Sequence, residues 1–520
     1  MMTSEGAAAA AESKGANVGN ATNPSAKGAA LSPLRLVVLA VLFTVAAALE
    51  SQRLTALFSA DVWWHLRAGL WMLQHHAVIR FGEFTQSAQN PWVASSWGYE
   101  VLLAILYRIA GLKAVCVALM LLKTALAAIT FWVAYAARRN FWTAVVLSLV
   151  AQYVLVELQP IPIVLSMLLF AVELYLLLSS RRGGDVRFLY ALPPLFLIWA
   201  NLHPLFVYGL LLLVLFVAAQ ALEKLYPSAN PAAGSHAQET FLKLCAASGA
   251  SLFATLLNPF SIHVYEDLYA TLFSRVQFNA LADMAAMEFR RPENFVLMLL
   301  VMAAFLALGL RRSRDVFSLS ALALFVMISF RIRRDAWTVV LLSIAVLAEC
   351  IFVSGKQEEA EAPGRFSAPS LAGVCGLSVL LLAAAIFHLP SNAVLTQRLA
   401  TAFPVKACDY IRANALPAPV FNSFSWGGFM EWYLPEYPVV IDGRLNLYGE
   451  EASENYFKLV GGALRLEDSP AFTGAQTILI ERKSGLAKAL TELPALSGQF
   501  HVVYQDDLAS VIVRNPARGQ

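Results

Sequence analysis

A small set of acidic, histidine and arginine side chains interrupts an otherwise apolar sequence, and one group stands in the stretch SADVWWHLRAGLWMLQHH at residues 59–76. On a helix that begins near Asp61, the side chains that share one face are those of Asp61, His65, Met72 and His76. A carboxylate beside an imidazole can accept a proton from a hydroxyl group, so we take Asp61 and His65 as candidate catalytic residues, with His65 orienting Asp61. The alternative is a structural role, because the helix dipole favours an aspartate near a helix N-terminus.

The opposite face of the same helix is apolar and aromatic. It carries Trp63, Leu66, Leu70 and Leu73. Because tryptophan is enriched at the headgroup level of membranes, we expect this face to dip into lipid while the Asp61 face looks into a cavity. The stretch then forms a helix parallel to the membrane and not part of a span.

A second group is the basic stretch RIRRD at residues 331–335. Its arginines, Arg331, Arg333 and Arg334, carry planar guanidinium groups that match phosphate oxygens bidentately, which predicts a phosphate-binding site. Two alternatives stay open: each arginine ends a span and snorkels to the interface, or the assignment of this loop to the outer face is wrong.

Further polar side chains in the same outer loops are candidates for substrate contacts. They are Glu83, Glu100, Asn201, His203, Asn258, His263 and Glu288. Surface carboxylates are commonly just solvated, and this is the alternative for the acidic members of the set.

The composition is that of an integral membrane protein. Of 520 residues, 58% are hydrophobic and 14% charged, and the mean hydropathy is +0.61, well outside the range of soluble domains. The net charge of +3 is small, and Lys and Arg occur in scattered short groups, which excludes a nucleic-acid partner. The five cysteines show no CxxC spacing and predict neither a disulfide framework nor a metal site.

About eleven apolar stretches approach the length of a membrane span, which needs roughly 20 residues. They lie near 33–50, 114–136, 141–157, 161–180, 187–203, 204–222, 241–257, 295–310, 316–331, 336–354 and 370–389. Basic residues in the loops at 137–140, 179–187 and 310–315 place these loops in the cytoplasm by the positive-inside rule.

The stretch WGYEVLLAILYRIAG at 97–111 would invert this topology if it also crossed the membrane. It is short, carries Glu100 and Arg108, and has an amphipathic pattern. We therefore expect a second interfacial helix there, inside one extracytoplasmic loop that covers residues 51–113.

The chain divides into three parts on this basis. Residues 1–32 are rich in Ala, Gly, Ser and Asn and predict a disordered cytoplasmic tail. Residues 33–390 form the multi-pass α-helical membrane domain, and residues 391–520 form an extracytoplasmic α/β domain. In that domain we expect strands at APVFN, PVVIDGR, TILIE, HVVY and ASVIVR, and a helix at EEASENYFKLVGG.

Two short segments of the C-terminal part could contribute to an acceptor-binding surface. They are SFSWGGFMEW, with Trp426, and VIDGR, with Asp442 and Arg444. The alternative is structural: a hairpin that turns at the two glycines, followed by a strand in which Asp442 and Arg444 pair with each other.

Several familiar catalytic motifs do not occur. The sequence has no GxxxxGK[ST], GxGxxG, HExxH or GxSxG pattern and no Asp-x-Asp pair. Nothing in it indicates a soluble nucleotide-linked donor.

The sequence resembles the GT-C superfamily of membrane glycosyltransferases, and most of all its bacterial mannosyltransferase-like branch, which uses polyprenyl-phosphate sugars. The resemblance rests on DVWWHLRAG and PWVASSWGYEVLLAILYRIAG, on LIWANLHPLFVYG and LLNPFSIHVY, and on FNSFSWGGFMEWYLPEYPVVIDGRLNLYG. It extends over most of residues 33–460. The sequence departs from the family pattern at Glu83, which stands where relatives often have Asp, at NLHP and at MEF.

The resemblance implies an extracytoplasmic active site in the first loop, with Asp61 as the catalytic base. The donor is then a sugar on a polyprenyl phosphate in the bacterial inner membrane, and the acceptor a glycan, lipid or protein of the envelope. The need for a divalent cation, Mg²⁺ or Mn²⁺, is left open. Two other functions also stay open: a transporter or flippase of a lipid-linked sugar, and a non-catalytic scaffold of an envelope polysaccharide complex.

Overall fold

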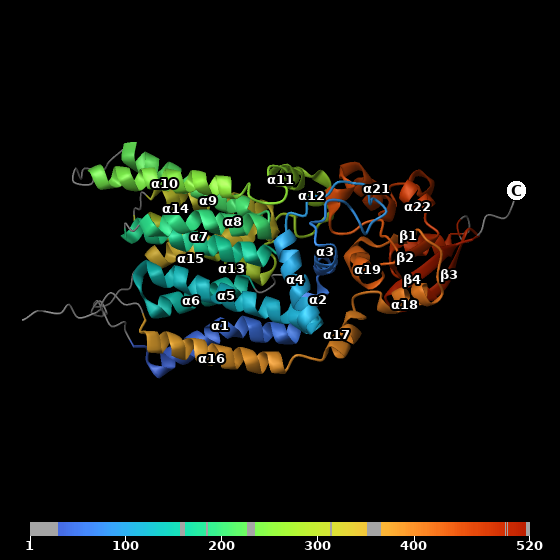
Figure 1. Cartoon of the computed structure of the whole chain (residues 1–520), viewed down its shortest axis with the longest axis horizontal. Coiled ribbons are helices and arrows are strands. Elements are labelled where there is room, and N and C mark those ends of the chain that lie inside the picture. The colour runs from blue at the N-terminus through green and yellow to red at the C-terminus, as the bar shows by residue number, and fades with distance from the viewer. Residues whose placement is uncertain are drawn as a thin grey trace, which may run out of the picture.

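A computed structural model describes residues 30–155, 162–183, 186–225, 234–311, 315–350, 366–493, 496 and 498–515. A long helical bundle carries a smaller α/β domain at one end (Figure 1). Residues 1–29 of the predicted N-terminal tail lie outside the described residues.

The bundle is built from apolar helices. They are α1 (Pro33–Arg53), α5 (Leu112–Arg138), α6 (Phe141–Val154), α7 (Ile163–Gly183), η1 (Val186–Ala191), α8 (Leu192–Leu202), α9 (Phe206–Leu225), α10 (Gly234–Ala254), α13 (Pro292–Leu310), α14 (Val316–Arg331), α15 (Trp337–Cys350) and α16 (Ala368–Phe387). Local signals set several of their starts: Ser32 and Ser367 each cap a helix that has proline in its first turn.

Six helices of the described chain are long and apolar enough to cross a membrane. They are α1, α5, α7, α9, α13 and α16. The shorter apolar helices include α6, the segment Val186–Leu202 and α14. Each of the eleven predicted stretches is helical over most of its length. The chain is therefore a helical protein with several candidate membrane spans, and the total of about eleven stays a prediction.

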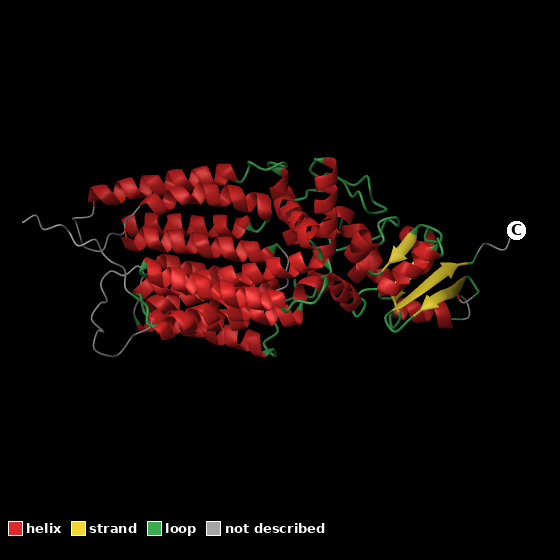
Figure 2. Cartoon of the chain, turned by 60° about the horizontal axis from the view of Figure 1, so that its bottom comes forward, coloured by secondary structure: helices red, strands yellow, loops and turns green. Residues whose placement is uncertain are grey.

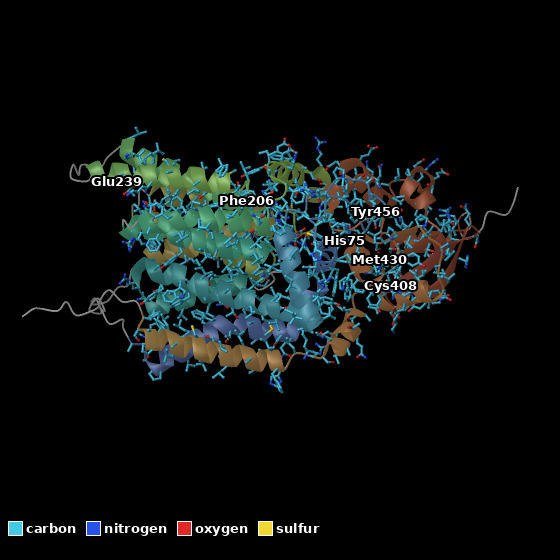
Figure 3. All side chains as sticks on the ribbon, in the orientation of Figure 1. His75, Phe206, Glu239, Cys408, Met430 and Tyr456 are labelled. Carbon is cyan, nitrogen blue, oxygen red and sulfur yellow. The ribbon has the colours of Figure 1, made fainter. Side chains whose placement is uncertain are left out.

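Ion pairs bring the basic loops together at one end of the bundle. Arg181 at the end of α7 contacts Asp315, at 2.8 Å, and Glu223 of α9, at 3.1 Å. The neighbouring Arg182 pairs with Glu349 near the end of α15. Glu239 of α10 lies at the same end in Figure 3, whereas Phe206 of α9 lies toward the other end. These pairs bring the ends of α7, α9 and α15 together with Asp315, at the start of α14, at one end of the bundle.

The opposite end carries the segment between α1 and α5. Here lie α2 (Thr55–Phe58), α3 (Asp61–His75) and α4 (Trp97–Ala110), with α4 running across the ends of the long helices (Figure 1). Gly111, at φ +64°, separates α4 from α5. α4 exposes Leu102, Ile105, Leu106 and Ile109 along one side, which is the apolar face expected of an interfacial helix.

The helix α3 packs on both sides, which corrects the prediction for its aromatic face. Trp63 and Leu66 are completely buried. The Trp63 ring lies 5.7 Å from Phe403, 5.5 Å from Phe429 and 4.6 Å from Trp432, measured between centroids. On the face that was expected to enter lipid, Trp63 is therefore covered by aromatic side chains of the C-terminal domain, whereas Leu70 and Leu73 are half-buried.

The C-terminal domain combines short helices with a small sheet (Figure 2). Its helices are α17 (Asn392–Leu399), α18 (Val405–Ala413), η4 (Phe424–Trp426), α19 (Gly427–Tyr433), α20 (Leu445–Tyr448), α21 (Glu450–Val460), η5 (Leu466–Asp468), α22 (Pro470–Thr473) and α23 (Gly485–Glu492). The strands are β1 (Val420–Asn422), β2 (Thr477–Glu481), β3 (Phe500–Gln505) and β4 (Ala509–Arg514), in the order β1-β2-β4-β3. β1 and β2 pair in parallel, whereas β2 with β4 and β3 with β4 pair antiparallel.

Most of the expected elements of this domain are confirmed, and two are wrong. The segment PVVIDGR forms no strand; its Val439 makes an isolated bridge to Thr85 of the first loop. The two glycines make no hairpin turn but begin α19. A Cβ on Gly427 would lie 2.0 Å from the Ile441 carbonyl oxygen, and one on Gly428 would lie 2.8 Å from the Ala60 carbonyl oxygen. The glycines therefore permit close backbone packing.

Candidate functional site

Asp61 is the first residue of α3 and lies where α3 meets the C-terminal domain. Nε1 of Trp64 donates a hydrogen bond to its Oδ1 at 3.1 Å. The backbone of Gly443 approaches the same oxygen so closely that a Cβ there would lie 2.1 Å from it. Figure 3 labels His75, the last residue of α3, and Met430 of α19, the helix that packs on α3. Asp61 as a residue nevertheless keeps part of its surface accessible.

The protein raises the pKa of Asp61 to about 6. Burial is the main cause, the Trp64 hydrogen bond opposes it, and the carboxylates of Asp283 and Asp442 add to the increase. The positive charge of Arg334 lowers the pKa again. An acid with this pKa is largely ionised at neutral pH and still holds a proton well, as a general base requires.

Arg334 is held in place by two other segments. Its Nε donates to Oδ1 of Asp335 at 3.2 Å, and its backbone N–H donates to the Asp283 carbonyl oxygen at 2.9 Å. The fully buried Asp335 also accepts a hydrogen bond from the Tyr208 hydroxyl at 2.5 Å. The short helix η3 (Arg333–Ala336) thus fixes a guanidinium group within electrostatic reach of Asp61.

The other two predicted arginines make different contacts. The guanidinium group of Arg331, which is exposed, lies 5.6 Å from the centre of the Phe278 ring. The backbone N–H of Arg333 donates to the Ala285 carbonyl oxygen at 3.0 Å. Of the three, Arg334 is thus the one whose charge acts on Asp61.

His65 does not contact Asp61 in the described structure but crosses to α4. Its Nδ1 lies 3.0 Å from Oε1 of Glu100, and both side chains are buried. Burial raises the pKa of Glu100 to about 8 and holds the pKa of His65 well below its usual value. Both shifts favour a neutral hydrogen bond over an ion pair at pH 7. The orienting contact expected of His65 is made by Trp64, and the pair His65–Glu100 joins α3 to α4.

The C-terminal domain supplies a buried charge cluster next to this site. Nε of Arg444 donates to both oxygens of Asp442, at 3.1 and 3.2 Å, and its Nη2 donates to Asp442 and to Glu431. The Tyr448 hydroxyl donates to Asp442 at 2.7 Å. Burial opposes ionisation of Asp442, but Arg444 beside it brings its pKa down to about 2. The internal pair expected between Asp442 and Arg444 is confirmed.

The same guanidinium group attaches the domain to the first loop. It lies 4.8 Å from the Trp92 ring centre and 5.6 Å from that of Trp64. Among the described residues, Nη1 of Arg444 and Oε2 of Glu431 are buried without a hydrogen-bond partner. The cluster therefore holds Gly443 against Asp61. It also contains two buried polar atoms, Nη1 of Arg444 and Oε2 of Glu431, that are free to bind a further group.

His203 lies in the same electrostatic neighbourhood. Its Nδ1 is 2.7 Å from the Ser166 hydroxyl, which also accepts from Nε1 of Trp199 at 2.8 Å. Burial and the charge of Arg334 lower the pKa of His203 to about 3, so the imidazole stays neutral. When both imidazoles are protonated, the charge of His203 lowers the pKa of His65.

Three other candidates hold the backbone in place. Asn201 accepts from Nε1 of Trp97 at 3.0 Å and donates to two carbonyl groups. Asn258 accepts from the backbone N–H of Phe260 at 2.8 Å. Trp426 is buried and donates to the Ala402 carbonyl oxygen at 3.3 Å. The hydrogen bonds of these residues connect segments around the site, and none of those described here is made to Asp61.

The remaining candidates are exposed. They are Glu83, His263 and Glu288. His263 pairs with Glu266 one turn along α11 (His263–Phe273), at 2.7 Å. No contact described for these three residues joins them to Asp61. Within the described part of the chain, no group of three or more His, Cys, Asp or Glu side chains could hold a metal ion.

Four residues around Asp61 were not predicted from the sequence as site residues: Trp64, Asp283, Glu431 and Gly443. Glu431 and Gly443 lie within the quoted segments SFSWGGFMEW and VIDGR, so the resemblance was the available signal for them. Asp283 carries no local signal, because it reaches the site through the loop that pairs with η3.

No protein-family model matches this sequence, and no curated protein matches it. The resemblance to the GT-C superfamily therefore rests on the segments quoted above and stays a prediction. The residues around Asp61 provide a separate basis for inferring a function.

Proposed function

We propose that the chain is an inverting glycosyltransferase that moves a sugar from a polyprenyl-phosphate donor to a hydroxyl group of an envelope glycan, lipid or protein. The reaction takes place at the end of the bundle that carries α3 and α4, which we assign to the extracytoplasmic face of the bacterial inner membrane. The observation that supports this most directly is the partly accessible Asp61, with a pKa near 6 and Arg334 within electrostatic reach.

The chemistry follows from these two charges. The acceptor hydroxyl loses its proton to a carboxylate oxygen of Asp61 while its oxygen attacks the anomeric carbon. The bond between that carbon and the phosphate oxygen breaks, and the polyprenyl phosphate leaves with the electron pair. Attack from the face opposite the leaving group inverts the anomeric centre. Because charge accumulates on the leaving phosphate, a fixed guanidinium group such as that of Arg334 stabilises the transition state.

The surrounding contacts supply rigidity. The Trp64 hydrogen bond and the Gly443 backbone hold one carboxylate oxygen, Oδ1, which leaves Oδ2 for the acceptor. The neutral pair His65–Glu100 holds α3 on α4 without adding a net charge beside Asp61. A base held in one position in this way is the arrangement that transfer chemistry needs.

The test is Asp61→Asn in membranes that contain the full-length chain and a radiolabelled polyprenyl-phosphate sugar. The asparagine oxygen can still accept from Trp64, so the fold should persist. Loss of the base should lower the transfer rate by about 10²–10⁴-fold. The matched control is Glu83→Gln, which neutralises an exposed acid of the same loop. Equal transfer by the Asp61 variant and the wild type would refute the proposal.

One observation favours a second candidate, a transporter of a lipid-linked sugar. Glu173 lies within α7, is completely buried, and neither of its carboxylate oxygens has a hydrogen-bond partner among the described residues. Ionisable groups inside a span often mark transport pathways. The two functions differ in product: a transferase attaches the label covalently to an acceptor, whereas a transporter moves the intact donor across the membrane.

A further inference from the structure

A pocket of about 490 Å³ lies between the first loop and the C-terminal domain, within the range of about 300–1,000 Å³ that is usual for ligand sites. Gln86 and Ser87 of the first loop line one part of it, and residues of α20, α21 and the start of α22 line most of the rest. Ile441 and Tyr456 in its lining are buried, whereas Gln86 and Glu451 are exposed. The pocket therefore has a buried floor and an exposed rim. Figure 3 labels Tyr456 in the C-terminal domain.

The polar side chains of this pocket fall into two groups. Some are used within the protein: the Tyr448 hydroxyl donates to Oδ2 of Asp442 at 2.7 Å, and Glu450 accepts from the Ser274 hydroxyl at 2.7 Å. Others have no side-chain hydrogen bond with any described residue, namely Ser87, Glu451 and Asn455. The first group builds the wall, and the second is available to a ligand.

The helix α21 directs part of the second group into the pocket. Asn455 lies four residues after Glu451 and three after Ala452, so these three side chains share one face of the helix. All three line the pocket. The Asn455 amide both donates and accepts hydrogen bonds, and the Glu451 carboxylate accepts them. Ala452 leaves room between the two polar groups.

The charge of the pocket narrows the class of ligand. Glu450 and Glu451 line it, and none of the described lining residues is Lys, Arg or His. This negative charge disfavours phosphate groups and acidic sugars. A neutral sugar chain suits the same lining, because its hydroxyl groups donate to carboxylates and exchange hydrogen bonds with an amide. Its C–H groups can contact apolar lining residues such as Ile441 and Pro470.

The pocket is also close to Asp61. Ile441 lines the pocket, and Gly443, two residues later, lies against Oδ1 of Asp61. Two residues of extended chain span at most about 7 Å. The Tyr448 hydrogen bond to Asp442 fixes the residue between them. The lining of the pocket and the surroundings of Asp61 therefore share one short, rigid segment.

We propose that this pocket binds a neutral oligosaccharide. The role of that oligosaccharide rests on the function proposed above: it is the acceptor, and the pocket holds sugar units next to the one whose hydroxyl group reacts. Among a glycan, a lipid and a protein as acceptor, the pocket thus selects a glycan. Its affinity for sugars does not depend on the donor, so binding and transfer can be measured separately.

The first test measures binding without donor. The purified full-length chain in detergent is applied to an array of immobilised bacterial envelope glycans and to a peptide array. We expect neutral glycans to bind, and acidic glycans and peptides not to bind. Ala452→Trp fills the pocket without changing its charge and should abolish binding. Asn455→Ala should weaken binding by about three- to tenfold, because it removes one or two hydrogen bonds between neutral groups.

Ala413→Trp is the matched control, because Ala413 is an exposed alanine at the end of α18 and does not line the pocket. Glycan binding by this variant should equal that of the wild type. Absence of binding to every neutral glycan, undiminished binding by Ala452→Trp, or a preference for peptides would each overturn the proposal.

The second test distinguishes this proposal from the proposed function. The assay uses a labelled polyprenyl-phosphate sugar as donor and the most tightly bound glycan as acceptor. Asn455→Ala should raise the KM for the acceptor about three- to tenfold and leave the KM for the donor unchanged. Glycan binding without transfer by the wild type would refute the transferase and support the pocket. Transfer with an unchanged acceptor KM in Asn455→Ala would refute the pocket and support the transferase.

Discussion

The substitution Gly443→Ala tests whether the C-terminal domain positions Asp61. A Cβ at this position would lie 2.1 Å from Oδ1 of Asp61, 3.1 Å from Nε1 of Trp64 and 3.3 Å from Cγ of Asp61. Gly443 is not among the residues with positive φ, so alanine introduces no backbone strain of its own. The side-chain contact with Asp61 is therefore the perturbation that the variant isolates.

The size of the effect follows from the distance. Ordinary contact begins at 3.4 Å, so the carboxylate must move by roughly 1 Å and lose its present hydrogen-bond geometry with Trp64. A misplacement of about 1 Å can reduce an enzyme rate by about 10²-fold. We expect the transfer rate to fall by about that factor, with little change in Tm because the aromatic packing of α3 on α19 is untouched.

The assay is transfer from a labelled polyprenyl-phosphate sugar in membranes, with Tm measured on the purified chain. Gly485→Ala is the matched control, because a Cβ there meets no atom within 4 Å. If both residues act on the same step, Gly443→Ala should add no further loss in the Asp61→Asn background. Full activity of Gly443→Ala, or additive losses in the double variant, would refute the positioning role.

Other predictions follow from the same contacts. Transfer should fall as the pH drops through about 6, the pKa of Asp61. Because this pKa lies above the ordinary aspartate value of 3.8, ionisation of Asp61 lowers the stability of the folded state. Asp61→Asn should therefore melt at a higher temperature than the wild type at pH 7, with a difference that shrinks toward pH 4. Arg334→Gln should raise the KM for the donor and move the acidic limb of the pH–rate profile to higher pH, because Arg334 lowers the pKa of Asp61; Arg331→Gln should leave that limb in place. Glu173→Met should raise Tm and leave transfer unchanged, because it removes a buried carboxyl group that has no hydrogen-bond partner among the described residues and costs about 1–3 kcal/mol. Loss of sugar movement across the membrane in this variant would favour a transporter.

Much of the helical architecture is predictable from the sequence because its causes are local. An apolar run must satisfy its own backbone hydrogen bonds in lipid, and a helix does so within one segment. The stretch at 97–111 could also be distinguished from the membrane spans by a local feature, because Glu100 and Arg108 interrupt its apolar pattern. The structure has a separate helix there, α4, which ends before Gly111. The strands β1, β2 and β4 were likewise visible as short runs of β-branched and aromatic residues.

The contacts around Asp61 could not be predicted from the sequence and are seen only in the tertiary structure. Helical periodicity placed Asp61 and His65 on one face of α3, but it could not show that His65 reaches Glu100, 35 residues away, or that Trp64 takes its place beside Asp61. Nor could it show that aromatic residues of α19 cover Trp63. Periodicity defines which side chains share a face, whereas the partner of that face depends on how distant segments pack. The sequence by itself determined the helices and the acid at the start of α3; the packing of α4, η3 and the C-terminal domain against α3 decided what surrounds that acid, because burial and neighbouring charges exist only once those segments meet.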